Sequence, residues 1–310
     1  MTIIEPQGDP VAALADGAGQ RSAGYYALRV LPPFLLLVLS GLLVAYQQSA
    51  LVHAVIQEAA AGVTSGGFWK AAAVGLLAQV VDGALGMAYG ITSTSFLLSV
   101  GVPPAAASAS VHLAEVFTTG FSGLSHWKLG NVNQALFRRL VIPGIVGAVL
   151  GAYLLTSIDG KVIRPYISSY LLVMGLYLLV KAFRRITINT EPPTYVAPLA
   201  LVGGFVDAVG GGGWGPVVTT SLVSSGQEPR RTIGSVNAAE FFIAVASGVS
   251  FAIMSAFTVW TTIAGLIFGG LFAAPLAAVL TKHAPTKLLM VIVGLLITGL
   301  SVYNLSQLFH

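Results

Sequence analysis

Long apolar runs fill most of this sequence, and most of them are about as long as a helix that crosses a lipid bilayer, roughly 20 residues. Hydrophobic residues make up 55% of the 310 residues and charged residues only 8%. A soluble domain carries about 25% charged residues, because its surface is in water. The sequence therefore predicts an all-α polytopic membrane protein, and it excludes a cytosolic enzyme, a secreted disulfide scaffold and a disordered chain. The apolar runs lie at about 27–47, 68–100, 104–126, 136–157, 162–183, 195–225, 230–254, 257–280 and 285–307.

The N-terminal part of the chain precedes the main block of apolar runs. Residues 1–24 lack the basic start and the short apolar core of a cleaved signal peptide, so we expect a cytoplasmic tail there. Residues 25–67 are expected to hold one transmembrane helix and a polar linker. The net charge of +4 does not indicate a nucleic-acid partner, because the basic residues are scattered between apolar runs and form no basic patch.

Two of the apolar runs, at 68–100 and 195–225, are longer than one crossing and are interrupted by glycines. A shift of 125 residues aligns the second run with the first without a gap, and 15 of the 42 positions from 82 to 123 are then identical. We therefore predict an internal duplication with repeats at 68–190 and 191–310, in which each broken run forms a discontinuous helix. The interrupting residues are Gly83, Gly86 and Gly90 in the first run, and Gly210 to Gly213 with Gly215 and Pro216 in the second.

The distribution of Lys and Arg indicates how these runs cross the membrane, because cytoplasmic loops carry an excess of basic residues. If every run crossed once, the two sides would hold 8 and 7 basic residues. If the two broken runs are re-entrant hairpins, the split is 12 to 3. The sharper split predicts a multi-pass protein of the cell inner (plasma) membrane with a cytoplasmic N-terminus. Each repeat then has a re-entrant helix pair and three transmembrane helices, and this odd number of crossings inverts one repeat relative to the other.

Four acidic residues lie deep in apolar runs, as the repeat-related pairs Asp82/Asp207 and Glu115/Glu240. An ionised carboxylate in a bilayer costs at least about 2.5 kcal/mol, so such residues are by default functional or tightly paired. Asp82 and Asp207 each precede a helix break, where they could accept hydrogen bonds from free backbone N–H groups or take part in ion coupling. Glu115 and Glu240 lie in mid-helix, where no cap is needed, and this leaves proton coupling or interhelical hydrogen bonds as their role.

Glu115 belongs to a polar stripe on the apolar run at 104–126. Such a stripe faces a cavity or the partner repeat rather than lipid. His112, one turn before Glu115, could form a protonatable pair with it. His112 and His126 lack a convincing third ligand, so no metal site is predicted. The stripe recurs at spacings of three and four and consists of Ser108, His112, Glu115, Thr119, Ser122 and His126.

The two glycine-rich breaks are the best candidates for a substrate site. Each is followed by a half-helix whose first N–H groups and positive dipole end would attract an anion. No Lys or Arg lies within a predicted helix core, so backbone and hydroxyl groups would supply most of the binding. Close helix packing is the alternative explanation for the glycines. The candidate substrate-binding residues are Tyr89, Gly90, Thr94, His112, Trp214, Gly215, Thr219 and Asn237, with Tyr89 and Trp214 expected to shape or gate the site.

At these residues the sequence resembles the sulfite exporter TauE/SafE family, also called the 4-toluene sulfonate uptake permease (TSUP) family. The second repeat carries the glycine-rich block G-G-F-V-D-A-V-G-G-G-G-W-G-P at 203–216, and Pro229, Ser235 and Asn237 follow in the expected order. The first repeat reads D-G-A-L-G-M-A-Y-G at 82–90, S-V-H-L-A-E-V at 110–116 and S-H-W-K-L-G-N-V at 125–132. The resemblance covers roughly residues 70–307. It implies export of sulfite or small organosulfonates, driven by a proton or ion gradient.

The predicted function is therefore a secondary transporter of a small oxyanion, with alternating access at the interface of the two repeats. An anion channel is one alternative, and a membrane-embedded enzyme or sensor is an alternative of another class. No nucleotide-binding or hydrolase motif occurs, so neither a cofactor nor an enzymatic activity is predicted. The expected partners are the small anionic substrate and the lipid bilayer, and a homodimer is left open.

Overall fold

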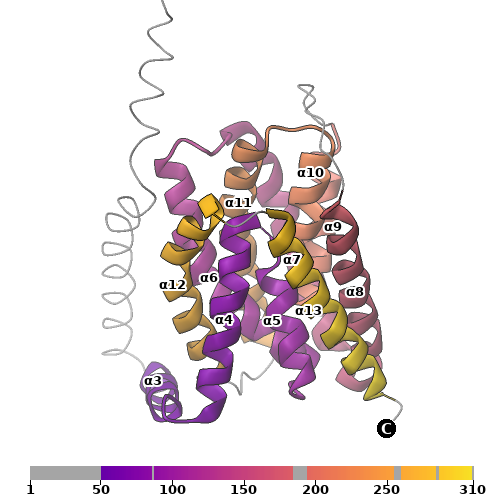
Figure 1. Ribbon diagram of the computed structural model, residues 1–310. Coiled ribbons are helices and arrows are strands. Elements are labelled where there is room, and N and C mark those ends of the chain that lie inside the picture. Colours follow the sequence, from indigo (N-terminus) through magenta and orange to yellow (C-terminus); the bar gives the residue numbers. More distant parts are fainter. Residues whose placement is uncertain (1–49, 86, 184–193, 255–259, 284–285, 309–310) are drawn as a thin grey trace, which may run out of the picture.

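The computed structural model describes residues 50–308, except residues 86, 184–193, 255–259 and 284–285. Within these residues every regular element is a helix (Figure 1). The tail expected at 1–24 and the helix expected at 27–47 lie outside the described residues. The described helices are α3 (Ala50–Gly62), α4 (Gly66–Leu85), α5 (Tyr89–Ser99), α6 (Pro104–Lys128), α7 (Gln134–Ser157), α8 (Gly160–Lys181), α9 (Val196–Gly210), the π-helical turn η1 (Gly215–Thr219), α10 (Thr220–Ser224), α11 (Pro229–Met254), α12 (Trp260–His283) and α13 (Thr286–Ser306).

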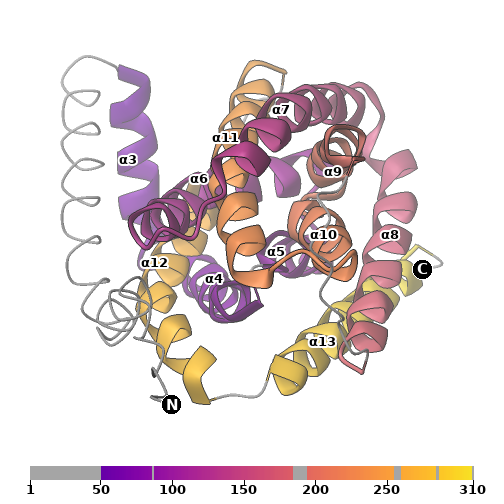
Figure 2. The ribbon, with the colours of Figure 1, turned by 90° about the horizontal axis from the view of Figure 1, so that it is seen from above.

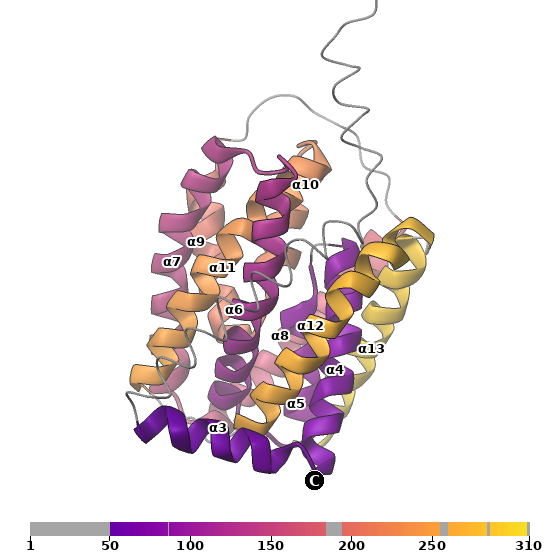
Figure 3. The ribbon, with the colours of Figure 1, turned by 90° about the vertical axis from the view of Figure 1, so that its left-hand side faces the viewer.

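The helices from α4 to α13 follow the apolar runs of the sequence closely. The part of the polar linker at residues 50–62 forms helix α3, which lies across one end of the other helices (Figure 3). Among the described residues, three helices are long and apolar enough to cross a membrane, namely α7, α8 and α11. Large apolar side chains on their outer faces are exposed, for example Ile142 at 71% and Ile253 at 79%, as expected of a surface that faces lipid.

Both predicted helix breaks are present. Helix α4 ends at Leu85 and α5 begins at Tyr89, while α9 ends at Gly210 and η1 begins at Gly215. Gly83 lies inside α4, so the first break begins later than the glycine pattern predicted. A glycine inside a helix is tolerated at a cost of about 1 kcal/mol relative to alanine, and it does not by itself end the helix.

Side chains at the helix starts explain where several helices begin. The Asn133 side chain accepts hydrogen bonds from the backbone N–H groups of Ala135 and Leu136, which caps α7. The Asp159 carboxylate accepts one from Lys161 N–H and caps α8. Pro104 opens α6, where its missing N–H group costs nothing because the first turn of a helix has no acceptor for it. These residues set where α6, which carries the polar stripe, and the next two helices begin.

Four helix pairs form most of the packing: α4 with α12, α7 with α9, α6 with α11, and α8 with α13. Glycines bring the backbones into contact. A Cβ atom on Gly269 of α12 would overlap the carbonyl of Ala72 in α4, and one on Gly147 of α7 would overlap the carbonyl of Leu201 in α9. Seen from above, α5 and α10 lie in the middle of the bundle, with the other helices around them (Figure 2). The two half-helices that follow the breaks are therefore interior elements.

Candidate functional site

The two helix breaks contact each other directly. A Cβ atom on Gly90 would lie 2.5 Å from Cα of Gly212 and 2.9 Å from Oε1 of Glu115. The Thr94 hydroxyl of α5 donates a hydrogen bond to the carbonyl of Gly211 in the other break. Gly211 and Gly212 have φ values of 65° and 142°, which side-chain-bearing residues rarely adopt. Glycine is thus required here both for backbone conformation and for close approach.

Asp82 and Asp207 bind the backbone at equivalent places in the two breaks. Asp207 Oδ1 accepts a hydrogen bond of 2.9 Å from the Trp214 N–H group. Asp82 Oδ1 accepts one of 3.4 Å from the Tyr89 N–H group. At each break the carboxylate therefore accepts a hydrogen bond from the N–H group seven residues later, where the next half-helix begins. Each carboxylate thus binds a free backbone N–H group at a helix break, which is one of the two roles that its position before the break suggested.

Tyr89 and Trp214, the first aromatic residues after the breaks, are buried with exposed fractions of 2% and 0%. The Tyr89 hydroxyl donates to the carbonyl of Leu266 at 3.3 Å, and the Trp214 ring N–H donates to the carbonyl of Val236 at 3.1 Å. Each ring is thereby anchored to a neighbouring helix, Tyr89 to α12 and Trp214 to α11. In this conformation both side chains fix the position of the half-helices.

His112, Glu115 and Asp207 form a compact buried group. His112 Nδ1 lies 2.7 Å from the carbonyl oxygen of Ser108, and since a carbonyl only accepts, Nδ1 carries a proton. His112 Nε2 lies 3.1 Å from Asp207 Oδ2. A hydrogen bond between these two atoms requires a proton on one of them.

His112, Glu115 and Asp207 each offer one nitrogen or oxygen atom that could bind a metal ion. These three atoms lie within 4.8 Å of one another. Oε2 of Glu115 is buried and has no hydrogen-bond partner among the described residues. The sequence predicted no metal site, because it offered His112 and His126 as ligands rather than this trio. The trio has the donor atoms to hold a small cation, and a shared proton satisfies the same His112–Asp207 contact.

All four buried acids come together at this point. Asp207, Glu240 and Asp82 lie close enough to Glu115 to repel its negative charge. The exposed fractions are 6% for Asp82, 2% for Glu115, 1% for Asp207 and 7% for Glu240, so water screens none of them strongly. The sequence placed these residues in two pairs, and the fold joins the pairs into one cluster beside the crossing of the breaks.

Comparison with known proteins identifies the family. A family model described as sulfite exporter TauE/SafE matches residues 71–304. The chain belongs to the sulfite exporter TauE/SafE family. The resemblance seen in the glycine-rich blocks is thereby confirmed, and the match covers both breaks and the whole acid cluster.

Two relatives of this TauE/SafE family member carry transporter names. The "probable membrane transporter protein YtnM" of Bacillus subtilis (strain 168) is 46% identical over 233 residues, which cover 71% of this chain and 77% of the relative. The "probable membrane transporter protein ORF9" of Sinorhizobium sp is 28% identical over 138 residues, 44% of this chain and 53% of the relative. No solved structure matches the chain. The family and these names indicate a membrane transporter.

The polar stripe of this TauE/SafE protein faces helices α9 and α11. The Ser108 hydroxyl donates to the carbonyl of Ala208 in α9 at 2.6 Å. Near the other end of the stripe, Ser122 accepts a hydrogen bond of 3.1 Å from the side-chain amide of Asn237 in α11. Asn237 Oδ1 is buried without a partner among the described residues. Thr219 and Gly215, which belong to η1, are also buried.

Two residues at the breaks were missed by sequence reasoning. The Tyr170 hydroxyl of α8 donates to the carbonyl of Gly212 at 3.0 Å. The Lys181 ammonium donates to the Thr220 hydroxyl at 2.6 Å and lies 3.4 Å from the sulfur of Met87. Although no Lys or Arg lies within a predicted helix core, the long side chain of Lys181 reaches inward from the end of α8 and places a positive charge beside the breaks. A lone tyrosine or a lysine at a helix end gives no sequence signal for such a role.

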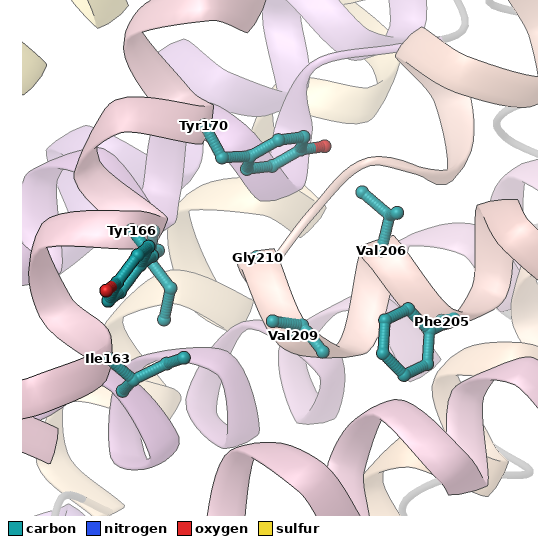
Figure 4. Close-up of a pocket in the computed structure, with 8 residues that line it drawn as sticks. Ile163, Tyr166, Tyr170, Phe205, Val206, Val209 and Gly210 are labelled. Carbon is teal, nitrogen blue, oxygen red and sulfur yellow. The ribbon is translucent and has the colours of Figure 1, made fainter. Parts of the chain in front are cut away.

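Two apolar pockets lie beside the site. One, of about 160 Å³, lies between α8 and α9 and reaches Tyr170 and Gly210 at the second break (Figure 4). The other, of about 430 Å³, lies between α6, α7 and α11 and is lined by residues such as Trp127, Phe137 and Phe242. Neither pocket is lined by a residue predicted to bind substrate. The candidate anion-binding groups are buried in this conformation.

Proposed function

We propose that this protein is a secondary transporter of a small oxyanion, such as sulfite or an organosulfonate, which it exports by alternating access. The observation that carries the proposal is the direct contact of two helix breaks beside a cluster of buried acids. In secondary transporters, substrate and coupling ion bind where discontinuous helices from two repeats meet. Family membership adds weight to this class of function.

Inverted repeats are part of the proposal, and the packing supports them. A shift of 125 residues relates α4 to α9 and α7 to α12, so the α4–α12 and α7–α9 pairs exchange under a two-fold axis. The same shift relates α6 to α11 and α8 to α13, and each of these helices packs on its own counterpart. The α5–α6 connection and the α10–α11 connection lie at opposite ends of the bundle (Figure 1). This is the pattern expected of two re-entrant pairs that enter from opposite sides.

The anion would bind at the starts of the two half-helices. Gly90 and Gly215 would let the backbone N–H groups approach it, with the hydroxyls of Thr94 and Thr219 beside them. His112 and Asn237 would add side-chain donors, since His112 borders the breaks and the Asn237 amide nitrogen, which donates one hydrogen bond to Ser122, carries a second N–H group. Tyr89 and Trp214 would set the position of the half-helices and so shape the site.

The acid cluster supplies a physical reason for coupling. An oxyanion near four buried carboxyl groups is strongly repelled unless these groups are neutralised. Binding of the anion would therefore require a cation, most simply protons, on Glu115 and Glu240, with Asp82 and Asp207 holding the broken backbone. Anion and cation would then move together in the same direction, and export would occur when the outward gradient of the anion exceeds the inward gradient of the cation.

The proposal is tested in proteoliposomes that contain purified protein and labelled sulfite. The wild type is expected to show saturable flux that a pH gradient drives. Glu115→Gln should lower the pH-driven flux at least about tenfold and retain sulfite counterflow. Glutamine has nearly the shape of glutamic acid, but it cannot take up or release a proton. Unchanged pH-driven flux in this variant would remove Glu115 from coupling. An absence of sulfite flux under every ionic condition would contradict the transporter itself and favour an enzyme or sensor.

A further inference from the structure

Lys181 joins the two broken helices from the end of α8. Its ammonium donates a hydrogen bond of 2.6 Å to the Thr220 hydroxyl, the first residue of α10. It also lies 3.4 Å from the sulfur of Met87, between α4 and α5. Thr220 itself contacts the same sulfur at 3.7 Å. One half-buried cation thus touches the first break and the half-helix that follows the second.

The ammonium has more donors than it has acceptors. A lysine ammonium carries three N–H donors, while the thioether of Met87 is only a weak acceptor. Among the described residues the ion pair found is His112–Asp207, and no carboxylate pairs with Lys181. A half-buried positive charge without a counter-ion is unfavourable, so this place favours an anionic ligand.

The other half-buried cation of α8 makes a useful comparison. Arg164, near the start of the helix, donates a hydrogen bond of 2.7 Å to the carbonyl of Leu98. That carbonyl lies in the last turn of α5, where a cation stabilises the negative end of the helix dipole. Helix capping therefore accounts for Arg164. Lys181 contacts no such carbonyl, and capping does not account for it.

We infer that Lys181 and Thr220 form an anion subsite at the face of the protein where α8 ends. The ammonium and the hydroxyl would bind oxygen atoms of the transported oxyanion between that face and the half-helix starts. This inference rests on the proposed transport of an oxyanion and names the residues that bind it at one entrance. Lysine suits the role because its flexible side chain and compact charge can follow an anion into the break.

The test compares the sulfite KM at the two faces in proteoliposomes with the protein in one orientation. Lys181→Gln is expected to raise KM roughly tenfold at the face where α8 ends, the effect of losing a charge-assisted hydrogen bond. The maximal rate and the KM at the opposite face should change by less than about twofold. Lys181→Arg should restore part of the affinity. The matched control is Lys161→Gln, an exposed lysine at the other end of α8, which should leave KM at the α8-end face unchanged.

Several outcomes would overturn the inference. An unchanged KM in Lys181→Gln, or a loss of maximal rate with KM unchanged, would reduce Lys181 to a structural role. An equal rise of KM at both faces would place it at the central site instead. If Lys181→Gln does not fold, Thr220→Val provides the same test by removing the hydroxyl, with an expected rise of about threefold. A wild type without sulfite flux would contradict the proposed function and not merely this subsite.

Discussion

The backbone of the first break is strained at a single residue. Ala88 has a φ of 97°, the one positive value among the described non-glycine residues. Its counterpart in the second repeat, 125 positions later, is Gly213. A left-handed conformation costs an L-residue roughly 1–2 kcal/mol and persists only where the surroundings enforce it. Here the Asp82–Tyr89 hydrogen bond and the packing of the two breaks hold the residue in place.

Replacement of Ala88 by glycine should relieve this strain. We expect Ala88→Gly to raise the free energy of unfolding by about 0.5–1 kcal/mol, measured by thermal unfolding in detergent. The same change at Ala78, in the interior of α4, should lower it by about 1 kcal/mol, because glycine weakens a regular helix. Opposite signs at the two positions are the expected result. A destabilisation of equal size at both would show that Ala88 is not strained.

Asp207 stabilises the second break as a hydrogen-bond acceptor, and this role does not require its negative charge. Asp207→Asn keeps an acceptor for the Trp214 N–H group, so the fold should be retained. Asp207→Ala leaves that N–H group and His112 unpaired, and we expect it to lower the free energy of unfolding by about 2–3 kcal/mol more than the Asn variant. Thermal unfolding of the two variants measures this difference. Equal stability of the two would mean that the hydrogen bond to the break contributes nothing.

At the scale of elements, the positions of most helices followed from the sequence. Apolar runs of bilayer length became helices within a few residues, because burial of apolar side chains and backbone hydrogen bonding both require it. The helix at 50–62 was missed because the stretch was interpreted as a polar linker, although nine of its 13 residues are apolar and alanine is the strongest helix former. The sequence predicted that the two breaks share one site, but it did not predict which residues of the breaks touch. Their contact depends on how the repeats pack, although the glycines at 210–213 marked one side of it.

The crossing of the breaks should tolerate no added side chain. A Cβ atom on Gly212 would overlap the backbone of Gly90 and Ile91, and the φ of 142° is itself unfavourable for alanine. We expect Gly212→Ala to lower the free energy of unfolding by at least about 2 kcal/mol and to abolish transport. Gly299→Ala in α13, where a Cβ atom meets nothing within 4 Å, should be neutral or stabilising. Thermal unfolding and flux assays check both, and normal behaviour of Gly212→Ala would contradict the close crossing.

At the scale of the whole molecule, the sequence indicated a duplicated membrane protein but could not show where charge accumulates. Asp82, Glu115, Asp207 and Glu240 were visible as buried acids, yet their meeting in one cluster depends on the packing of α6 and α9. Lys181 was visible as a residue at a segment end, yet the reach of its side chain was not. The acid cluster gives a chain poor in charge a buried acidic centre, and Lys181 places a cation at one side of that centre. An anion can enter that centre only with compensating positive charge.

The most direct test of alternating access is counterflow by the wild-type protein. Proteoliposomes are loaded with unlabelled sulfite and diluted into a trace of labelled sulfite, with no pH or voltage gradient. A secondary transporter should accumulate label transiently above its equilibrium level, because each outward step returns a labelled anion. Uptake that rises to equilibrium without an overshoot, together with a large uncoupled current, would indicate a channel and contradict the proposed mechanism.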